Sequence, residues 1–196
     1  MTDTDRAVTS EHQRAPHLPG DTHIWVMVLG DLVIFGAYFL IFMIYRAMTP
    51  GEFLAAQQHL DITIGVVNTI VLVTSSWFVA RGVLAARYGD HTRAVRLTYL
   101  GAGFGVLFMV IKAYEWATKI AHDDTITSNG FFSFYYMLTG VHLFHVALGV
   151  LILGVVIRDL RNPNHRRMSM VESGAIYWHM VDLLWIVIFA LFYVMR

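Results

Sequence analysis

His142 and His145 lie three residues apart, and His179 and Asp182 repeat that spacing nearer the C-terminus. Side chains at this spacing share one face of a helix. Imidazole and carboxylate groups can bind metal, ligate haem or carry protons. Both pairs sit in apolar segments long enough to cross a bilayer, where ionisable groups indicate a function by default.

The histidines alone do not define a metal site. Zinc needs three or four ligands, and its usual helical pair is spaced i, i+4. His142 and His145 are either buried histidines that form hydrogen bonds between helices or ligands. A haem b could bind one of them together with His179, because bis-histidine ligation takes one histidine from each of two helices. These residues do not make up a complete set of metal ligands, so no metal site is predicted.

Carboxylates also lie within the apolar segments. Asp31 is about seven residues inside the first one, where it either accepts a hydrogen bond from a neighbouring helix or handles protons. Gly30 and Gly36 flank it, and such small residues would let the neighbouring helix approach closely.

Glu172, His179 and Asp182 fall at i, i+7 and i+10, which places them on one helical face. The inner half of a bundle could therefore collect these three residues together with Asp31 and His145. Such a polar cluster is either a fully hydrogen-bonded packing core or a proton-active site.

Lys112, Glu115 and Lys119 form another charged group, in which Glu115 can pair with either lysine on one helical face. Lys119 could extend its ammonium group to the membrane surface, whereas Lys112 lies deeper. The group is either a neutralised structural pair or a proton relay or lipid-headgroup anchor.

The helices that position these residues follow from five apolar segments, at about 24–45, 62–86, 96–120, 131–158 and 172–195. Within hydrocarbon, a helix satisfies its own backbone. We therefore predict an all-α polytopic membrane protein, with a mobile polar tail over 1–23 and a bundle of five transmembrane helices over 24–196. Arginines gather in the tail and in the second and fourth loops, which predicts a cytoplasmic N-terminus and a C-terminus outside.

Composition supports the membrane class, because 57% of the 196 residues are hydrophobic and 14% are charged. Fourteen basic and fourteen acidic side chains balance, so no nucleic-acid partner is expected. The absence of cysteine excludes disulfides and Cys-ligated metal centres.

Several further residues are predicted to pack the helices together. They are Asn68 and Ser75 on the second span, Gly101 and Gly105 on the third, and Trp178 and Trp185 on the fifth. An aromatic cluster, Phe131, Phe132, Phe134, Tyr135 and Tyr136, predicts an interfacial belt at the outer surface.

These stretches together resemble subunit III of the haem-copper oxidase family. The resemblance is carried by Asn68-Thr69 with Thr74-Ser75-Ser76, by Lys112 to Trp116, by Leu138-Thr139-Gly140 with His142, His145 and Gly149, and by Glu172 with Tyr177-Trp178-His179, Val181-Asp182 and Trp185. It covers all but the N-terminal tail. Asp31 stands where the family usually has a glutamate implicated near proton uptake.

The resemblance implies the five-helix form of a subunit that binds no haem or copper itself. Its partners would be catalytic subunit I and subunit II, with structural phospholipid, in the inner (plasma) membrane of a bacterial cell. The compact length and the aromatic cluster are also similar to subunit III homologues beside nitric oxide reductases, so an accessory role there stays open. A haem-b membrane cytochrome is the more remote alternative.

Overall fold

The computed structural model describes residues 22–122, 125–127, 130–162 and 167–195, and every regular element within them is a helix. The predicted polar tail over 1–23 falls almost wholly outside these residues. The elements are α2 (Thr22–Met48), α3 (Pro50–Gln57), α4 (Ile62–Arg87), α5 (His91–Ala121), α6 (Gly130–Arg161), α7 (Met168–Phe189) and the π-helical turn η1 (Ala190–Val194).

Five helical stretches of the described chain are long and apolar enough to cross a membrane. They are His23–Met48, Ile62–Arg87, His91–Ala121, Gly130–Arg161 and Met168–Val194. The predicted five spans and the all-α membrane class are therefore confirmed. The helices extend beyond the apolar segments because polar residues continue or cap them. Asp90, for example, accepts a hydrogen bond from the backbone N–H of Arg93 at 3.0 Å and starts α5 ahead of its apolar run.

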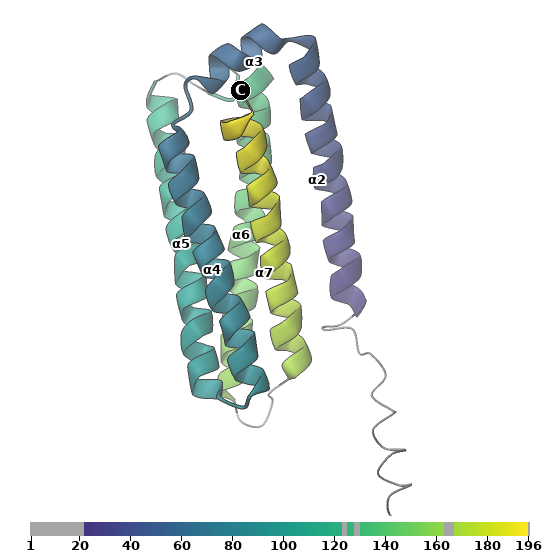
Figure 1. Ribbon diagram of the computed structural model, residues 1–196, viewed down its shortest axis with the longest axis vertical. Coiled ribbons are helices and arrows are strands. Elements are labelled where there is room, and N and C mark those ends of the chain that lie inside the picture. The colour runs from purple at the N-terminus through teal and green to yellow at the C-terminus, as the bar shows by residue number, and fades with distance from the viewer. Residues whose placement is uncertain (1–21, 123–124, 128–129, 163–166, 196) are drawn as a thin grey trace, which may run out of the picture.

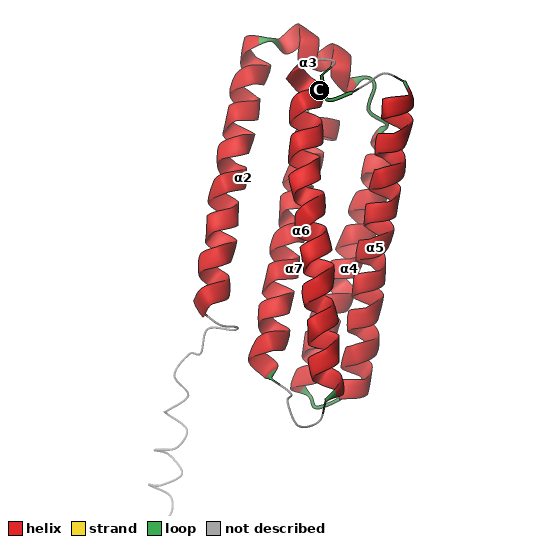
Figure 2. Cartoon of the chain, turned by 180° about the vertical axis from the view of Figure 1, so that it is seen from behind, coloured by secondary structure: helices red, strands yellow, loops and turns green. Residues whose placement is uncertain are grey.

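Helices α4, α5, α6 and α7 run side by side, and α2 stands at one edge of this group (Figures 1 and 2). The short helix α3 crosses one end of the bundle, where the C-terminus also lies; we call this the α3 end. α3 was not predicted as a separate helix. Pro50 occupies its first turn, and Phe53 and Ala56 are buried beneath it.

Helices α4 and α5 pack closely against each other. The Ser75 hydroxyl donates a hydrogen bond to the backbone oxygen of Gly101 at 2.7 Å, and a Cβ atom on Gly101 would lie 2.6 Å from Val79 Cγ2. The predicted packing role of Gly101 is confirmed. Gly105 faces a different neighbour, because its Cβ would lie 2.5 Å from the Trp178 ring of α7.

The aromatic cluster at the start of α6 is largely buried, so the predicted interfacial belt is wrong for most of it. Phe131, Phe132 and Tyr135 are at most 1% exposed. Phe131 packs edge-on against Phe53 of α3 and Phe192 of η1, with ring centroids 5.7 and 5.5 Å apart. Helix α3 folds back over these rings and covers the surface that they would otherwise present to the membrane interface.

Candidate functional site

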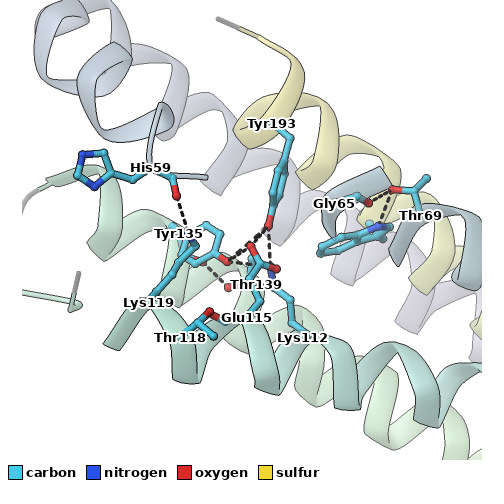
Figure 3. Close-up of polar contacts among 11 residues, drawn as sticks. His59, Gly65, Thr69, Lys112, Glu115, Thr118, Lys119, Tyr135, Thr139 and Tyr193 are labelled. Carbon is cyan, nitrogen blue, oxygen red and sulfur yellow. Dashed lines mark hydrogen bonds and ion pairs between the residues drawn. The ribbon is translucent and has the colours of Figure 1, made fainter. Parts of the chain in front are cut away.

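A buried ion pair with two tyrosines lies toward the α3 end of the bundle (Figure 3). Lys112 Nζ donates hydrogen bonds at 2.9 Å to Glu115 Oε2, to the Tyr135 hydroxyl and to the Tyr193 hydroxyl. Both tyrosine hydroxyls in turn donate to Glu115 Oε1, at 2.9 and 2.5 Å. Every ammonium hydrogen of Lys112 therefore has an acceptor, which buried charges require.

The other lysine of this group takes a separate partner. Lys119 Nζ donates to the backbone oxygen of His59 at 2.8 Å, and the residue is only 7% exposed (Figure 3). Of the two lysines that could pair with Glu115, Lys112 does so. Glu115, Lys119, His59 and Asp61 also line an open cavity of about 450 Å³ at the α3 end.

Asp31 of α2 faces His145 of α6. The Asp31 Oδ1 and His145 Nε2 atoms are 3.6 Å apart, and the Phe35 ring lies edge-on to the imidazole with centroids 5.4 Å apart. The other imidazole nitrogen, Nδ1, is 2.8 Å from the backbone oxygen of Val141. A carbonyl only accepts, so Nδ1 carries a proton and Nε2 faces the carboxylate. The predicted proximity of Asp31 and His145 is thus present in the structure.

The two glycines beside Asp31 do not form the predicted close contact with a neighbouring helix. A Cβ atom added to Gly30 or to Gly36 would have no atom of the described chain within 4 Å. The prediction was wrong because these glycines lie on the open side of α2, whereas Phe35 and Phe42 form its packed side.

Glu172 is separate from the other acidic residues of the predicted polar cluster. Its Oε1 accepts hydrogen bonds from Arg87 Nη2 at 2.8 Å and Arg87 Nε at 3.1 Å, at the end of the bundle opposite α3. The Arg87 side chain is 49% exposed. The expected single cluster therefore falls into three groups: Asp31 with His145, Glu172 with Arg87, and His179 with Asp182.

His179 and Asp182 form the third group with Ser76 of α4. The Ser76 hydroxyl and His179 Nδ1 share a hydrogen bond of 2.6 Å, and Asp182 Oδ2 lies 3.9 Å from the same nitrogen. A catalytic serine would need the opposite ring nitrogen from the one that faces the carboxylate. Serine and aspartate both approach Nδ1 here, so the geometry is that of an interhelical contact and not of a nucleophilic triad.

His142 and Asn68 are buried in the bundle and their polar side-chain atoms have no hydrogen-bond partner among the described residues. The His142 imidazole lies between Phe108 and Trp185, with ring centroids 5.7 and 5.4 Å away. Two aromatic rings therefore pack against this imidazole. His142 is buried, as one interpretation expected, but the interhelical hydrogen bond of that interpretation is wrong for this residue.

The tryptophans of α7 form hydrogen bonds that join this helix to α4. Trp178 Nε1 donates to the Ser75 hydroxyl and Trp185 Nε1 donates to the Thr69 hydroxyl, each at 3.1 Å. Both indoles are at most 1% exposed. Their stripe, predicted from the seven-residue spacing, is a buried seam between two helices.

Two polar residues of the bundle were missed in the sequence. Tyr193 supplies a hydroxyl to Lys112 and Glu115, although an aromatic near the end of a span is more typical of the membrane interface. Gln57 of α3 donates from Nε2 to the backbone oxygens of Leu191, Phe192 and Met195 at 3.3, 3.2 and 2.9 Å. Neither has a motif that would single it out.

The described residues contain no group of three or more His, Cys, Asp or Glu side chains arranged to hold a metal ion. What the polar groups of the spans can do is therefore inferred from the hydrogen bonds and ion pairs that they form. These link α2 to α6, α4 to α7, and α5 to both α6 and η1.

Comparison with known proteins gives a consistent result over nearly the whole chain. The family described as cytochrome c oxidase subunit III matches residues 21–196. Cytochrome c oxidase subunit 3 of Synechocystis is 28% identical over 95% of this chain and 85% of its own length. The protein of that name from Corynebacterium diphtheriae is 33% identical over 86% of this chain and 84% of its own. A heme-copper oxidase subunit I+III of Aeropyrum pernix is 28% identical over 93% of this chain and 23% of its own length.

Proposed function

The chain belongs to the cytochrome c oxidase subunit III family and is a subunit III of a haem-copper oxidase, and from this premise we propose that it works without redox centres of its own. In this proposal it stabilises the catalytic subunit, holds phospholipid and supports proton uptake during turnover. The haem and copper belong to its partner subunits.

The observation that carries the proposal is the way in which the charged groups inside the spans are used. Lys112 and Glu115 neutralise each other beneath two tyrosines, and Asp31 lies against His145. These contacts hold helices to one another within the bundle. Polar groups arranged in this way support a rigid scaffold. We assign the support of proton uptake to Asp31, whose side chain reaches the surface of this chain with 21% exposure.

Direct contact with the catalytic subunit is supported by the relative from Aeropyrum pernix, whose name joins subunit I and subunit III in one chain. Two parts joined covalently in one protein are expected to pack together when they occur as separate chains. We propose catalytic subunit I as the principal partner, with subunit II in the same complex. The relatives named above favour an oxidase over a nitric oxide reductase or a haem-b cytochrome.

The surface of the membrane-spanning helices supports two further parts of the proposal, the bound phospholipid and the location of the chain in a membrane. Large apolar side chains are exposed along the membrane-spanning helices, for example Val33, Val110 and Leu151 at 71%, 60% and 67%. Such side chains are suited to lipid tails. We propose the inner membrane of a bacterial cell, with the N-terminus in the cytoplasm. The reason is that arginines gather at the end of the bundle away from α3, where α2 also begins: Arg87 on α4, Arg93 and Arg96 on α5, and Arg158 and Arg161 on α6.

The proposal is tested on the assembled oxidase. An oxidase prepared without this chain should begin turnover at a near-normal rate and then lose activity sooner than the full complex. The Asp31→Ala variant should slow proton uptake or shorten the catalytic lifetime, and Asp31→Glu should restore both because it keeps the acid. Unchanged activity over many turnovers in Asp31→Ala would make Asp31 structural only. Immediate loss of turnover without the chain, in a complex otherwise whole, would contradict the scaffold role.

A further inference from the structure

A groove runs along the outer face of the bundle between α4 and α7. Its volume is about 380 Å³. Trp77, Leu183 and Ile186 form apolar walls, and Ser76, His179 and Asp182 also line it. The wall side chains are strongly exposed, Trp77 at 57% and Leu183 at 51%, so nothing in the described chain covers this groove.

The polar residues of the groove lie near the middle of their spans. His179 is eleven residues from the start of the Met168–Val194 span and fifteen from its end, or about 17 and 22 Å along the helix axis. Ser76 lies at a similar depth in Ile62–Arg87, about 21 Å from one end and 17 Å from the other. At this depth lipid tails offer no hydrogen-bond partner.

Both polar side chains contributed by α7 are left with unused hydrogen-bonding capacity. Asp182 is 5% exposed, and neither of its carboxylate oxygens has a hydrogen-bond partner among the described residues. Its distance of 3.9 Å from His179 Nδ1 is too long for a hydrogen bond. The Asp182 carboxylate therefore lies close to this imidazole and to the Ser76 hydroxyl, without a hydrogen bond of good geometry to either.

Only one nitrogen of the His179 imidazole is engaged by the described residues. His179 Nδ1 is engaged by Ser76 at 2.6 Å, and its side chain is 42% exposed. If Ser76 donates to Nδ1, then Nε2 carries the proton and is a donor; if Nδ1 donates to Ser76, then a neutral imidazole has Nε2 as an acceptor. In either tautomer Nε2 has a hydrogen bond to give or to take, and none of the described residues supplies its partner.

We propose that this groove receives a transmembrane helix of the catalytic subunit, and that a polar side chain of that helix forms a hydrogen bond with His179 Nε2 at mid-membrane depth. The inference rests on the proposed function and adds to it the face and the atom through which the subunits join. Lipid tails can fill the apolar walls but cannot satisfy the imidazole, so a helix with a serine, threonine, asparagine or histidine at that depth fits the groove as a whole.

Photo-crosslinking in membranes that contain the assembled oxidase tests the face. A photoreactive amino acid at Leu183, on the groove wall, should yield an adduct with the catalytic subunit. The same amino acid at Val110, an exposed position on α5, is the matched control and should yield lipid adducts. Adducts from Leu183 with lipid alone, or with a second copy of this chain, would overturn the proposal. If the chain still co-purifies with the oxidase in that case, the proposed function stands and only this docking face is wrong.

Substitutions of His179 test the hydrogen bond. His179→Phe keeps a ring of similar size and removes both nitrogens, and it should raise the dissociation constant of this chain from the detergent-solubilised oxidase roughly threefold to tenfold. His179→Gln places an amide near the position of Nε2 and should retain most of the affinity. Folding is checked for each variant by thermal unfolding. Equal affinity for His179→Phe and wild type, with both folded, would overturn the hydrogen-bond assignment.

Discussion

Lys112 Nζ lies 2.9 Å from Glu115 Oε2, and the two side chains are 1% and 2% exposed. A buried pair of this kind stabilises a protein only when the remaining hydrogen-bonding groups of both partners are satisfied. The hydroxyls of Tyr135 and Tyr193 meet that need and bring α6 and η1 to the pair on α5. The network therefore fixes how three elements assemble at the α3 end.

Removing one charge of this pair should be far more harmful than removing both. Lys112→Met leaves a buried carboxylate without its counter-ion and should lower the free energy of unfolding by about 3–5 kcal/mol. The double variant Lys112→Met, Glu115→Leu should recover much of that loss. Unfolding of the purified oxidase complex, followed in detergent, measures both. A double variant less stable than the single one would show that the pair is a net source of stability.

The glycines of α5 should respond differently to alanine according to their neighbours. Gly105→Ala would press a methyl group into the Trp178 ring and should cost about 1–3 kcal/mol of unfolding free energy. Gly103→Ala is the matched control, because a Cβ there meets no atom of the described chain within 4 Å. Alanine is the better helix former, so Gly103→Ala should be neutral or slightly stabilising. Equal destabilisation by both changes would contradict this packing.

The helices were predictable because the length and apolar character of a span follow directly from the thickness of the bilayer. The depth and the lateral placement of single residues were not. Glu172 and His179 share a helical face, but seven residues separate them by about 10 Å along the axis, and this distance places Glu172 beside Arg87 and His179 beside Ser76. The sequence pattern predicts which face of a helix a residue occupies, but it does not predict which residue of a neighbouring helix it contacts.

The aromatic residues show a second limit of prediction from the sequence. A run of phenylalanine and tyrosine at the start of a span has the same pattern whether it meets lipid headgroups or a covering segment. Phe131 and Tyr135 are buried because α3 and η1 pack over them. Helix α3 was not predicted, and the residues of η1 were predicted only as the end of the fifth span. Tyr193 was missed for the same reason. Its role depends on a contact with Lys112, 81 residues away in the chain.

Asn68 and Ser75 lie on one face of α4 and should behave in opposite ways. Asn68 is fully buried with neither amide atom hydrogen-bonded among the described residues, so Asn68→Leu should raise the free energy of unfolding by about 1–2 kcal/mol. Ser75→Ala removes the acceptor of Trp178 Nε1 and the donor to Gly101, and should lower it by a similar amount. Thermal unfolding of the complex compares the two variants. A loss in Asn68→Leu as large as that in Ser75→Ala would show that the amide gains partners in the assembled oxidase.

Gln57 should control the order of the C-terminal turn. Its side chain joins α3 to three backbone oxygens of residues 191–195, which the end of a helix leaves without intrahelical partners. Gln57→Leu removes these bonds and should lower local stability by about 1–3 kcal/mol, so that amide hydrogens of Ala190–Val194 exchange faster with solvent. Gln58→Leu makes the same chemical change at the adjacent exposed position and is the matched control. Hydrogen exchange followed by mass spectrometry on the intact oxidase measures both variants, and equal protection of 190–194 in Gln57→Leu and Gln58→Leu would show that the turn is held by the aromatic packing of Phe192 instead.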